Sequence, residues 1–306
     1  MRDPPRHVAA SVRQRLLNHA RAIGADPALV HLWYGLERFL YRLSVSPYRD
    51  RFILKGALLF RVWGTDEFRP TRDVDVLAFL AADEPELRRI IAEVVSFQVV
   101  DDGLTFDATR MRIDTIRDAQ EYGGFRVALQ ALLGTTRIPL QIDIGFGDAV
   151  TPEALESAYP VLLDFPAPAL RVYPRETVVA EKLEAIVSLG MPNTRMKDFY
   201  DLWVLSRRYE FSGDVLSQAI RATFERRGTP LPVGLPIGLS ADYAADAAHR
   251  AQWEAFLTRE TREVDSGATL DVVVRDVSGF VWPPAQAAHG GHPFGKTWKA
   301  GICWSP

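Results

Sequence analysis

The spacing of apolar residues in the first half of the chain changes between helical and strand periods. At 8–24 and 26–41 the apolar residues recur every three or four positions, which predicts two amphipathic helices, the second capped by Asp26-Pro27. The pattern then predicts, in order, a strand at 52–54, a brief helix at 57–63, a polar loop at 64–72, a strand at 73–79, a helix at 83–97 and strands at 110–116, 125–132 and 138–144. Asp114 lies inside the first of those three strands without support from the pattern.

The second half is predominantly helical in its spacing. Prolines interrupt a connection after Gly147, and helices are predicted at 175–189, 197–209, 212–227 and 240–262. The last stretch, 282–306, contains Pro, Gly, three Trp and two His without a period, which predicts an ordered tail lying on a surface. We therefore expect an α+β protein with two domains: a mixed sheet with flanking helices in residues 1–150, and a helical domain with the Trp/Gly/Pro-rich tail in residues 151–306.

Composition excludes several classes of protein. The 306 residues are 47% hydrophobic and 25% charged, with a formal net charge of −3, which is typical of a globular protein and argues against a wholly basic nucleic-acid binder. A single cysteine, Cys303, excludes a disulfide framework and a cysteine-based zinc site. No apolar stretch approaches the length of a membrane span and residues 1–19 lack a signal-peptide pattern, so we expect a cytoplasmic protein without membrane association.

Two aspartates separated by one residue lie in the strand predicted at 73–79, within Thr71-Arg72-Asp73-Val74-Asp75. Because residues i and i+2 of a strand share a face, both carboxylates point the same way while the valines enter the core. Carboxylates this close together need a cation to neutralise them, and Mg²⁺ prefers oxygen ligands. The alternative is a solvated strand face, because D-x-D alone is a common pattern.

A third aspartate, Asp143, lies between Ile142 and Ile144 near the end of an apolar strand. A carboxylate there is costly unless it is paired or bound to metal. If this strand lies beside the D-x-D strand, three carboxylates converge, which is the minimum set for two-metal phosphoryl or nucleotidyl transfer. The alternative is an aspartate hydrogen-bonded to a turn at 145–147.

The segment Lys55-Gly56-Ala57 joins a predicted strand to a predicted helix. A strand followed by glycine and a helix start presents backbone N–H groups to an anion, and Lys55 can act as a point charge against a triphosphate.

The helical half contributes Glu181-Lys182-Leu183 and the start of the helix predicted at 197–209. Asp198 and Asp201 share a helical face, as do Lys197 and Asp201. The alternative is a first-turn charge at Asp198 and a surface ion pair between Lys197 and Asp201. Only five of the 36 basic residues are lysines, and three of the five lie in the segments singled out here, which favours function.

Taken in order, these segments resemble the AbiEii/AbiGii-type nucleotidyltransferase toxin family. This family includes the MenT toxins and belongs to the DNA polymerase β-like nucleotidyltransferase superfamily. The resemblance covers roughly 52–205 and is carried by Lys55-Gly56, Thr71-Arg72-Asp73-Val74-Asp75, Ile142-Asp143, Glu181-Lys182-Leu183 and Arg195-Met196-Lys197-Asp198-Phe199-Tyr200-Asp201-Leu202. The family usually has a second small residue of the Gly-Gly or Gly-Ser type after the lysine, whereas this chain has Ala57, so its loop would hold the triphosphate differently.

The resemblance implies a minimal nucleotidyltransferase core and a helical C-terminal domain forming the far wall of a cleft. Asp73 and Asp75 would bind Mg²⁺, and Asp143 would complete the site or act as base on the attacking hydroxyl. Lys182 would contact the nucleotide phosphates across the cleft, and Asp201 matches an essential aspartate of the family's last motif. The other residues implied in nucleotide binding are Lys55, Gly56, Ala57, Arg72, Arg195, Lys197 and Asp198.

The function implied by the resemblance is transfer of a nucleoside monophosphate from an NTP to an RNA, with the tRNA 3′ end as the expected acceptor. The partner implied is an antitoxin with a winged-helix DNA-binding domain. Two alternatives stay open: a catalytically silent relative that acts by binding, which Ala57 favours, and a metal-dependent glycosyltransferase, which also uses D-x-D but does not predict Asp143.

Two further groups of residues have ordinary surface interpretations. The arginine clusters at 88–89, 207–208 and 221–227 can contact an RNA backbone but equally suit solvated helix faces. His289 and His292, in the Gly-rich tail, have no third ligand nearby and are better explained as a surface loop than as a metal site.

Overall fold

The computed structural model describes residues 8–64, 71–81, 83–116, 123–260 and 268–306. The polar loop predicted at 64–72 lies largely outside these residues. The chain forms two compact units, one built mainly from residues 1–65, 71–147 and 155–172, the other mainly from 148–154 and 173–306. Each is described separately.

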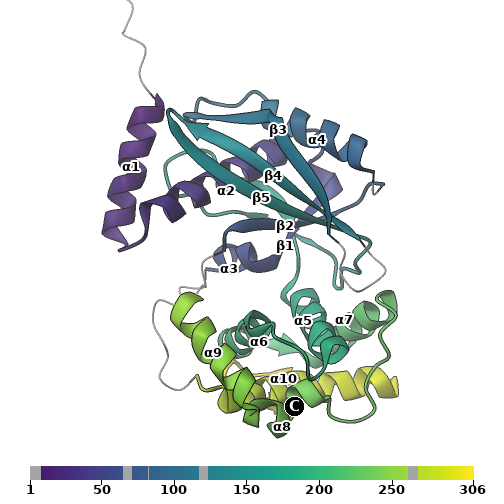
Figure 1. The fold of residues 1–306 in the computed structure, drawn as a ribbon. Coiled ribbons are helices and arrows are strands. Elements are labelled where there is room, and N and C mark those ends of the chain that lie inside the picture. Colours follow the sequence, from purple (N-terminus) through teal and green to yellow (C-terminus); the bar gives the residue numbers. More distant parts are fainter. Residues whose placement is uncertain (1–7, 65–70, 82, 117–122, 261–267) are drawn as a thin grey trace, which may run out of the picture. The chain divides into compact units, whose positions relative to one another are not determined.

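A seven-stranded mixed sheet is the centre of the first unit (Figure 1). Its strand order is β3-β4-β5-β2-β1-β7-β6, in which β2 runs parallel to β5 and β1 parallel to β7. The strands are β1 (Phe52–Lys55), β2 (Asp73–Ala78), β3 (Leu104–Ile116), β4 (Gly124–Leu133), β5 (Thr136–Phe146), β6 (Leu155–Ala158) and β7 (Ala169–Val172). The α+β class is confirmed, and the strands predicted at 52–54, 73–79, 110–116, 125–132 and 138–144 are all present.

Helix α2 (Pro27–Val45) packs on one face of this sheet, and the carboxylates lie on the opposite face. The helices of the unit are α1 (Val8–Ala22), α2 (Pro27–Val45), α3 (Leu59–Val62) and α4 (Glu84–Ser96), with single 3₁₀ turns at Arg49–Arg51 and Gly56–Leu58. Figure 1 shows α2 crossing the sheet, and Gly35 allows this helix to lie close to Leu140 of β5. The buried face of β5 alternates through Ile138, Leu140, Ile142 and Ile144, so Asp143 lies on the other face.

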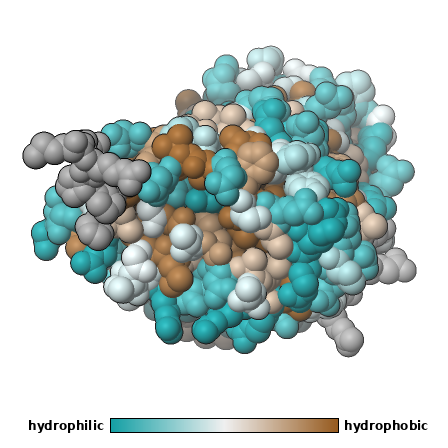
Figure 2. Space-filling model, turned by 90° about the horizontal axis from the view of Figure 1, so that it is seen from above, coloured by the Kyte–Doolittle hydropathy of each residue, from teal (hydrophilic) through white to brown (hydrophobic). Residues whose placement is uncertain are grey.

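The surface of the first unit is not uniformly hydrophilic. Figure 2 views it from above and shows apolar residues gathered towards the middle of that face, with hydrophilic residues around them. Over the part of the chain that the structure describes, no helix is both long and apolar enough to cross a membrane.

The second unit is largely helical, as its spacing predicts. It contains α5 (Arg175–Leu189), α6 (Met196–Arg208), α7 (Gly213–Arg226), α8 (Ala241–Ala245), α9 (Ala247–Glu260) and α10 (Leu270–Gly290), with a 3₁₀ turn at Ile237–Leu239. A small sheet joins β8 (Phe211–Ser212), β9 (Thr297–Trp298) and β10 (Trp304–Ser305) in the order β10-β9-β8.

The predictions for the connection after Gly147, for the helix at 240–262 and for the start of the tail at 282–306 are wrong. The connection after Gly147 contains two strands, β6 and β7, that extend the sheet of the first unit. The helix predicted at 240–262 is divided at Asp246, whose carboxylate caps α9 by accepting from the N–H groups of residues 248 and 249.

The predicted tail at 282–306 is helical over its first third. Helix α10 continues through Pro283 and Pro284 to Gly290, because Ala285, Ala287 and Ala288 bury one face of its last turns. It ends where Gly291 takes a left-handed conformation. The remainder is ordered as the prediction expected, and Trp298 Nε1 donates to the carbonyl of Ser206 at 2.6 Å.

Candidate active site

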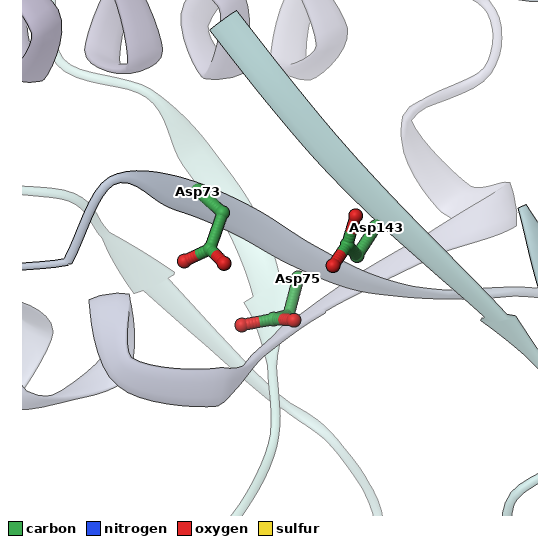
Figure 3. Close-up of side chains that lie close together, drawn as sticks. All are labelled: Asp73, Asp75 and Asp143. Carbon is green, nitrogen blue, oxygen red and sulfur yellow. The ribbon is translucent and has the colours of Figure 1, made fainter. Parts of the chain in front are cut away.

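Three carboxylates lie close together on one face of the sheet in the first unit (Figure 3). Asp73 and Asp75 lie two residues apart on β2, and Asp143 of β5 is directly opposite Asp75 in the parallel ladder. Each offers an oxygen within 4.8 Å of the oxygens of the other two. The structure thus brings together the three residues that the sequence singled out, and all three are half-buried rather than on a fully solvated strand.

Strand register places a positive residue on either side of this acidic group. Lys55 of β1 is directly opposite Asp75, and Arg126 of β4 is directly opposite Asp143. A row of four charges therefore crosses four neighbouring strands in the order Lys55, Asp75, Asp143, Arg126. In an antiparallel ladder, opposite residues have their Cβ atoms about 5 Å apart, so neighbours in the row are within electrostatic reach.

Arg126 holds Asp143 through two hydrogen bonds. Its Nε donates to Oδ1 at 2.9 Å and its terminal nitrogen to Oδ2 at 2.7 Å. These bonds raise the pKa of the Arg126 guanidinium, burial acts against them, and the nearby aspartates add to the rise. The alternative that Asp143 bonds to the turn at 145–147 is wrong, because its carboxylate is held by Arg126 and by Gln141 at 3.4 Å.

Asp73 is positioned by a chain of contacts that begins in helix α2. Trp33 Nε1 donates to the carbonyl of Thr71 at 3.1 Å, and Thr71 Oγ1 donates to Oδ1 of Asp73 at 2.5 Å. Thr71 is buried, so its hydroxyl is a fixed donor rather than a mobile surface group. The neighbouring Arg72 is exposed.

Gly56 is required by the close approach of the Asp75 carboxylate. Its φ of +72° is in the left-handed region, and a Cβ added at this position would lie 2.0 Å from Oδ2 of Asp75. Ala57, where the family usually has a second Gly or a Ser, is buried. The junction after β1 thus forms a cradle for Asp75.

We expect Gly56→Ala to displace Asp75 and to reduce the activity of the site at least about a hundredfold, because misplacement of an active-site group by about 1 Å has an effect of this size. The matched control is Gly64→Ala, since Gly64 has nearly the same φ of +70° but nothing within 4 Å of its added Cβ. Left-handed strain of about 1–2 kcal/mol applies to both variants. Thermal unfolding and steady-state rates separate the two effects; equal loss of activity in both variants would contradict the close-approach argument.

A second group of charges lies within the helical unit. Lys182 Nζ of α5 donates to Asp198 at 2.9 Å and to Asp201 at 2.7 Å, both on α6. The aspartate side chains are 1% and 2% exposed and that of Lys182 is 14% exposed, so this is a buried ion cluster. The alternative of a surface pair between Lys197 and Asp201 is wrong, because Asp201 is buried against Lys182 while Lys197 is exposed.

Asp198 of this cluster has a strongly lowered pKa. Burial by itself would raise its pKa, but the charges of Lys182 and Arg195 outweigh burial and hold the pKa well below the usual range. Arg195 Nε donates to the second oxygen of Asp198 at 2.5 Å, although the arginine side chain is itself half-exposed.

A further ion cluster in this unit escaped the sequence analysis. Arg227, at the end of α7, contacts Glu181 and Glu184 of α5 and also Asp148. Burial lowers the pKa of the Arg227 guanidinium, but the three carboxylates around it raise the pKa by more. Its sequence neighbours, Arg226 and Glu225, indicated only a charged helix end, so no local signal distinguished it.

The arginines at 88–89 take the ordinary role that the sequence left open. Arg88 pairs with Glu84, and Arg89 pairs with Glu86 and Glu93, all on α4.

His292 has its Nδ1 beside the carbonyl of Pro293. Within the described ranges, the only group of three side chains that could hold a metal ion is the aspartate triad.

The donor set of this triad fits a hard divalent cation. Three half-buried carboxylates provide oxygen ligands, and the chain supplies no histidine or cysteine there to favour a softer metal. Three such carboxylates on adjacent strands are the arrangement that metal-assisted phosphoryl or nucleotidyl transfer requires.

Comparison with known proteins gives the particular family. The chain belongs to the nucleotidyl transferase AbiEii toxin family of type IV toxin–antitoxin systems, whose family model matches residues 38–278. This confirms the resemblance and the enzyme class, and it excludes the glycosyltransferase alternative.

Two crystal structures from Helicobacter pylori are similar to the chain. One is JHP933, with 17% sequence identity over 87% of this chain and 94% of that protein, at a TM-score of 0.47. The other, assigned as a nucleotidyltransferase, has 16% identity over 90% of this chain and 95% of that protein, at a TM-score of 0.44. No curated protein matches the sequence.

Proposed function

We propose that this protein uses Mg²⁺ to transfer a nucleoside monophosphate from an NTP to an RNA acceptor, with the 3′ end of tRNA as the first candidate. The observation that carries the proposal is the convergence of Asp73, Asp75 and Asp143 on adjacent strands in a chain of this family. In the reaction, a hydroxyl oxygen of the acceptor forms a bond to the α-phosphorus and gives up its proton to solvent, while the bond from that phosphorus to the bridging oxygen breaks and pyrophosphate leaves.

Each residue of the first unit has a proposed part in this reaction. Asp73, Asp75 and Asp143 hold the cation, which, when bound, supplies charge stabilisation at the reacting phosphate oxygens. The bonds from Thr71 to Asp73 and from Arg126 to Asp143 keep two of these carboxylates in fixed orientations. For the triphosphate we propose contacts from Lys55, from the backbone at Gly56 and Ala57, and from Arg72.

We propose that the helical unit takes part through its own charged cluster. Lys182, Arg195, Lys197 and Asp198 are the proposed nucleotide-binding residues, and Asp201 is the proposed catalytic residue of the last motif. The two ion pairs of Lys182 support a defined position for its ammonium group, because a lysine tied to two buried carboxylates loses most of its rotamer freedom.

The proposed partner is an antitoxin with a winged-helix DNA-binding domain, and the proposed compartment is the cytoplasm. Residues 1–150 and 151–306 are the proposed functional domains, the first bearing the metal site and the second the cluster around Lys182.

The experiment that tests the function is incubation of the purified protein with total tRNA, Mg²⁺ and each labelled NTP in turn, with Asp75→Asn in parallel. We expect label in tRNA with one NTP or a small set, and none with the variant. Labelling that persists in the variant would contradict the role of the triad. Absence of label with every NTP would contradict tRNA as acceptor, and titration of NTP with and without Mg²⁺ would then show whether a silent, binding-only protein explains the result.

A further inference from the structure

Asp114, the aspartate that the strand pattern does not explain, extends the charge row described above. It lies on β3 directly opposite Arg126, and Arg126 lies directly opposite Asp143. Arg126 is thus flanked by two carboxylates at similar spacing, on its two neighbouring strands. Asp143 is 16% exposed and belongs to the triad, whereas Asp114 is exposed and lies outside it.

In the structure Arg126 forms its ion pair with Asp143 rather than with Asp114. Its two hydrogen bonds engage both oxygens of that carboxylate, and its only ion pair with a described residue is to Asp143. A cation bound by the triad would therefore share Asp143 with a guanidinium whose positive charge repels it. The Arg126 side chain is 47% exposed, so it has solvent-side freedom to move.

We propose that Arg126 is a positioning residue. Its guanidinium pairs with Asp143 while no divalent cation is bound, and it pairs with Asp114 instead when Asp143 binds the cation. This rests on the proposed function, because it concerns the same carboxylate triad. The two hydrogen bonds from Arg126 orient Asp143 and neutralise its charge, so repulsion among the three carboxylates does not push their side chains apart. The attraction of Asp114 then determines how easily Arg126 releases Asp143. Arg126 and Asp114 together therefore set the affinity of the triad for its cation.

The test is calorimetric titration of Mn²⁺ into the full-length protein without nucleotide, with Mn²⁺ as an oxygen-preferring probe. We expect Arg126→Ala to raise Mn²⁺ affinity about fivefold to tenfold, because it removes a competing and partly screened charge. Asp114→Asn should lower the affinity about threefold, since it removes the second carboxylate whose attraction favours release of Arg126 from Asp143. In the double variant, Asp114→Asn should have almost no further effect, because its influence passes through Arg126.

Two variants make the result specific. Arg137→Ala removes an equal charge from an exposed position six residues before Asp143 on β5, about 20 Å along the strand, and should leave the affinity unchanged. Arg126→Lys keeps the charge but cannot engage both oxygens in the same way, so it should fall between wild type and Arg126→Ala, and it covers the case in which the alanine variant folds poorly.

The outcomes separate this inference from the proposed function. Suppose that Asp75→Asn removes Mn²⁺ binding, but Arg126→Ala leaves the Mn²⁺ affinity unchanged or lowers it. The proposed change of partner by Arg126 is then wrong, while the metal site at the triad is supported. If Asp114→Asn changes the Mn²⁺ affinity equally with and without Arg126, Asp114 acts only through its own charge. The proposed change of partner by Arg126 is then also wrong. If the wild type shows no Mn²⁺ binding that Asp75→Asn removes, the metal site itself is wrong, and the inference fails with it.

Discussion

Replacement of Asp75 by asparagine is expected to reduce nucleotidyl transfer by about a thousandfold or more and to leave the melting temperature unchanged or slightly higher. The carboxylate is central in the triad, next to Asp73 on its own strand and opposite Asp143. Loss of its charge removes a ligand of the cation, and cation stabilisation of this kind contributes several kcal/mol, of which about 4 kcal/mol corresponds to a thousandfold in rate. Asp73 and Asp143 repel the charge of Asp75 while Lys55 opposite it attracts that charge, so these effects offset one another and we expect little net loss of stability.

The variant keeps the volume of the side chain, so it does not open a gap against Gly56, where the carboxylate fits closely. Asp50→Asn is the matched control, because Asp50 is exposed in the 3₁₀ turn before β1 and outside the triad. Rates with saturating NTP and calorimetric melting of both variants give the answer. A fall in melting temperature of more than about 10 °C, corresponding to several kcal/mol in a chain of this size, would instead assign Asp75 a structural role.

The triad was accessible from the sequence because its parts follow local rules. The i, i+2 spacing places Asp73 and Asp75 on one face of any strand, and an aspartate between two isoleucines identified Asp143 as a buried charge that needs compensation. Their convergence was conditional on β2 and β5 being neighbours, which strand pattern alone does not decide. The structure supplies that adjacency, with β5 parallel to β2.

The partners of these carboxylates were not accessible in the same way. Arg126 lies 17 residues from Asp143, and only the register of the β4–β5 hairpin shows that the two are opposite. The same holds for Gly56, where an added Cβ would lie 2.0 Å from a carboxylate oxygen on another strand. Positions set by strand register or by close approach have no local signature, so the sequence singled out the three carboxylates but not the residues that hold them.

The helical unit shows the same distinction for ion pairs. Helical spacing suggested that Lys197 pairs with Asp201, since they are one turn apart. Packing of α5 against α6 instead brings Lys182 to Asp201 and leaves Lys197 in solvent. Similarly, the stretch 282–306 was predicted to be a tail without a helical period, whereas burial of Ala285, Ala287 and Ala288 accompanies the continuation of α10 through its two prolines. Tertiary burial overrode the local preference in both cases.

Lys182→Met is expected to destabilise the helical unit by about 3–5 kcal/mol at neutral pH. The substitution keeps an apolar side chain of similar length but leaves Asp198 and Asp201 buried without the ammonium that both of them contact. An uncompensated buried charge has a cost of this size, whereas an exposed lysine contributes little. Lys197→Met is the matched control, because it removes the same charge from an exposed position at the start of α6 and should leave stability nearly unchanged. Hydrogen exchange of the α5 and α6 amides measures the effect within this unit.

The pH dependence gives this prediction a second, independent readout. In the wild type the pKa of Asp198 is depressed by Lys182 and Arg195, so the folded state binds fewer protons than the unfolded state, and the stabilisation from this pair is present above about pH 4 and lost as the pH falls below that value. Without Lys182, burial of Asp198 acts against only the half-exposed Arg195, so its pKa rises and protonation relieves the buried charge. The stability deficit of Lys182→Met should therefore be largest near neutral pH and shrink on acidification below about pH 4. A deficit that is constant with pH would show that lost packing, rather than charge compensation, explains the effect of the substitution.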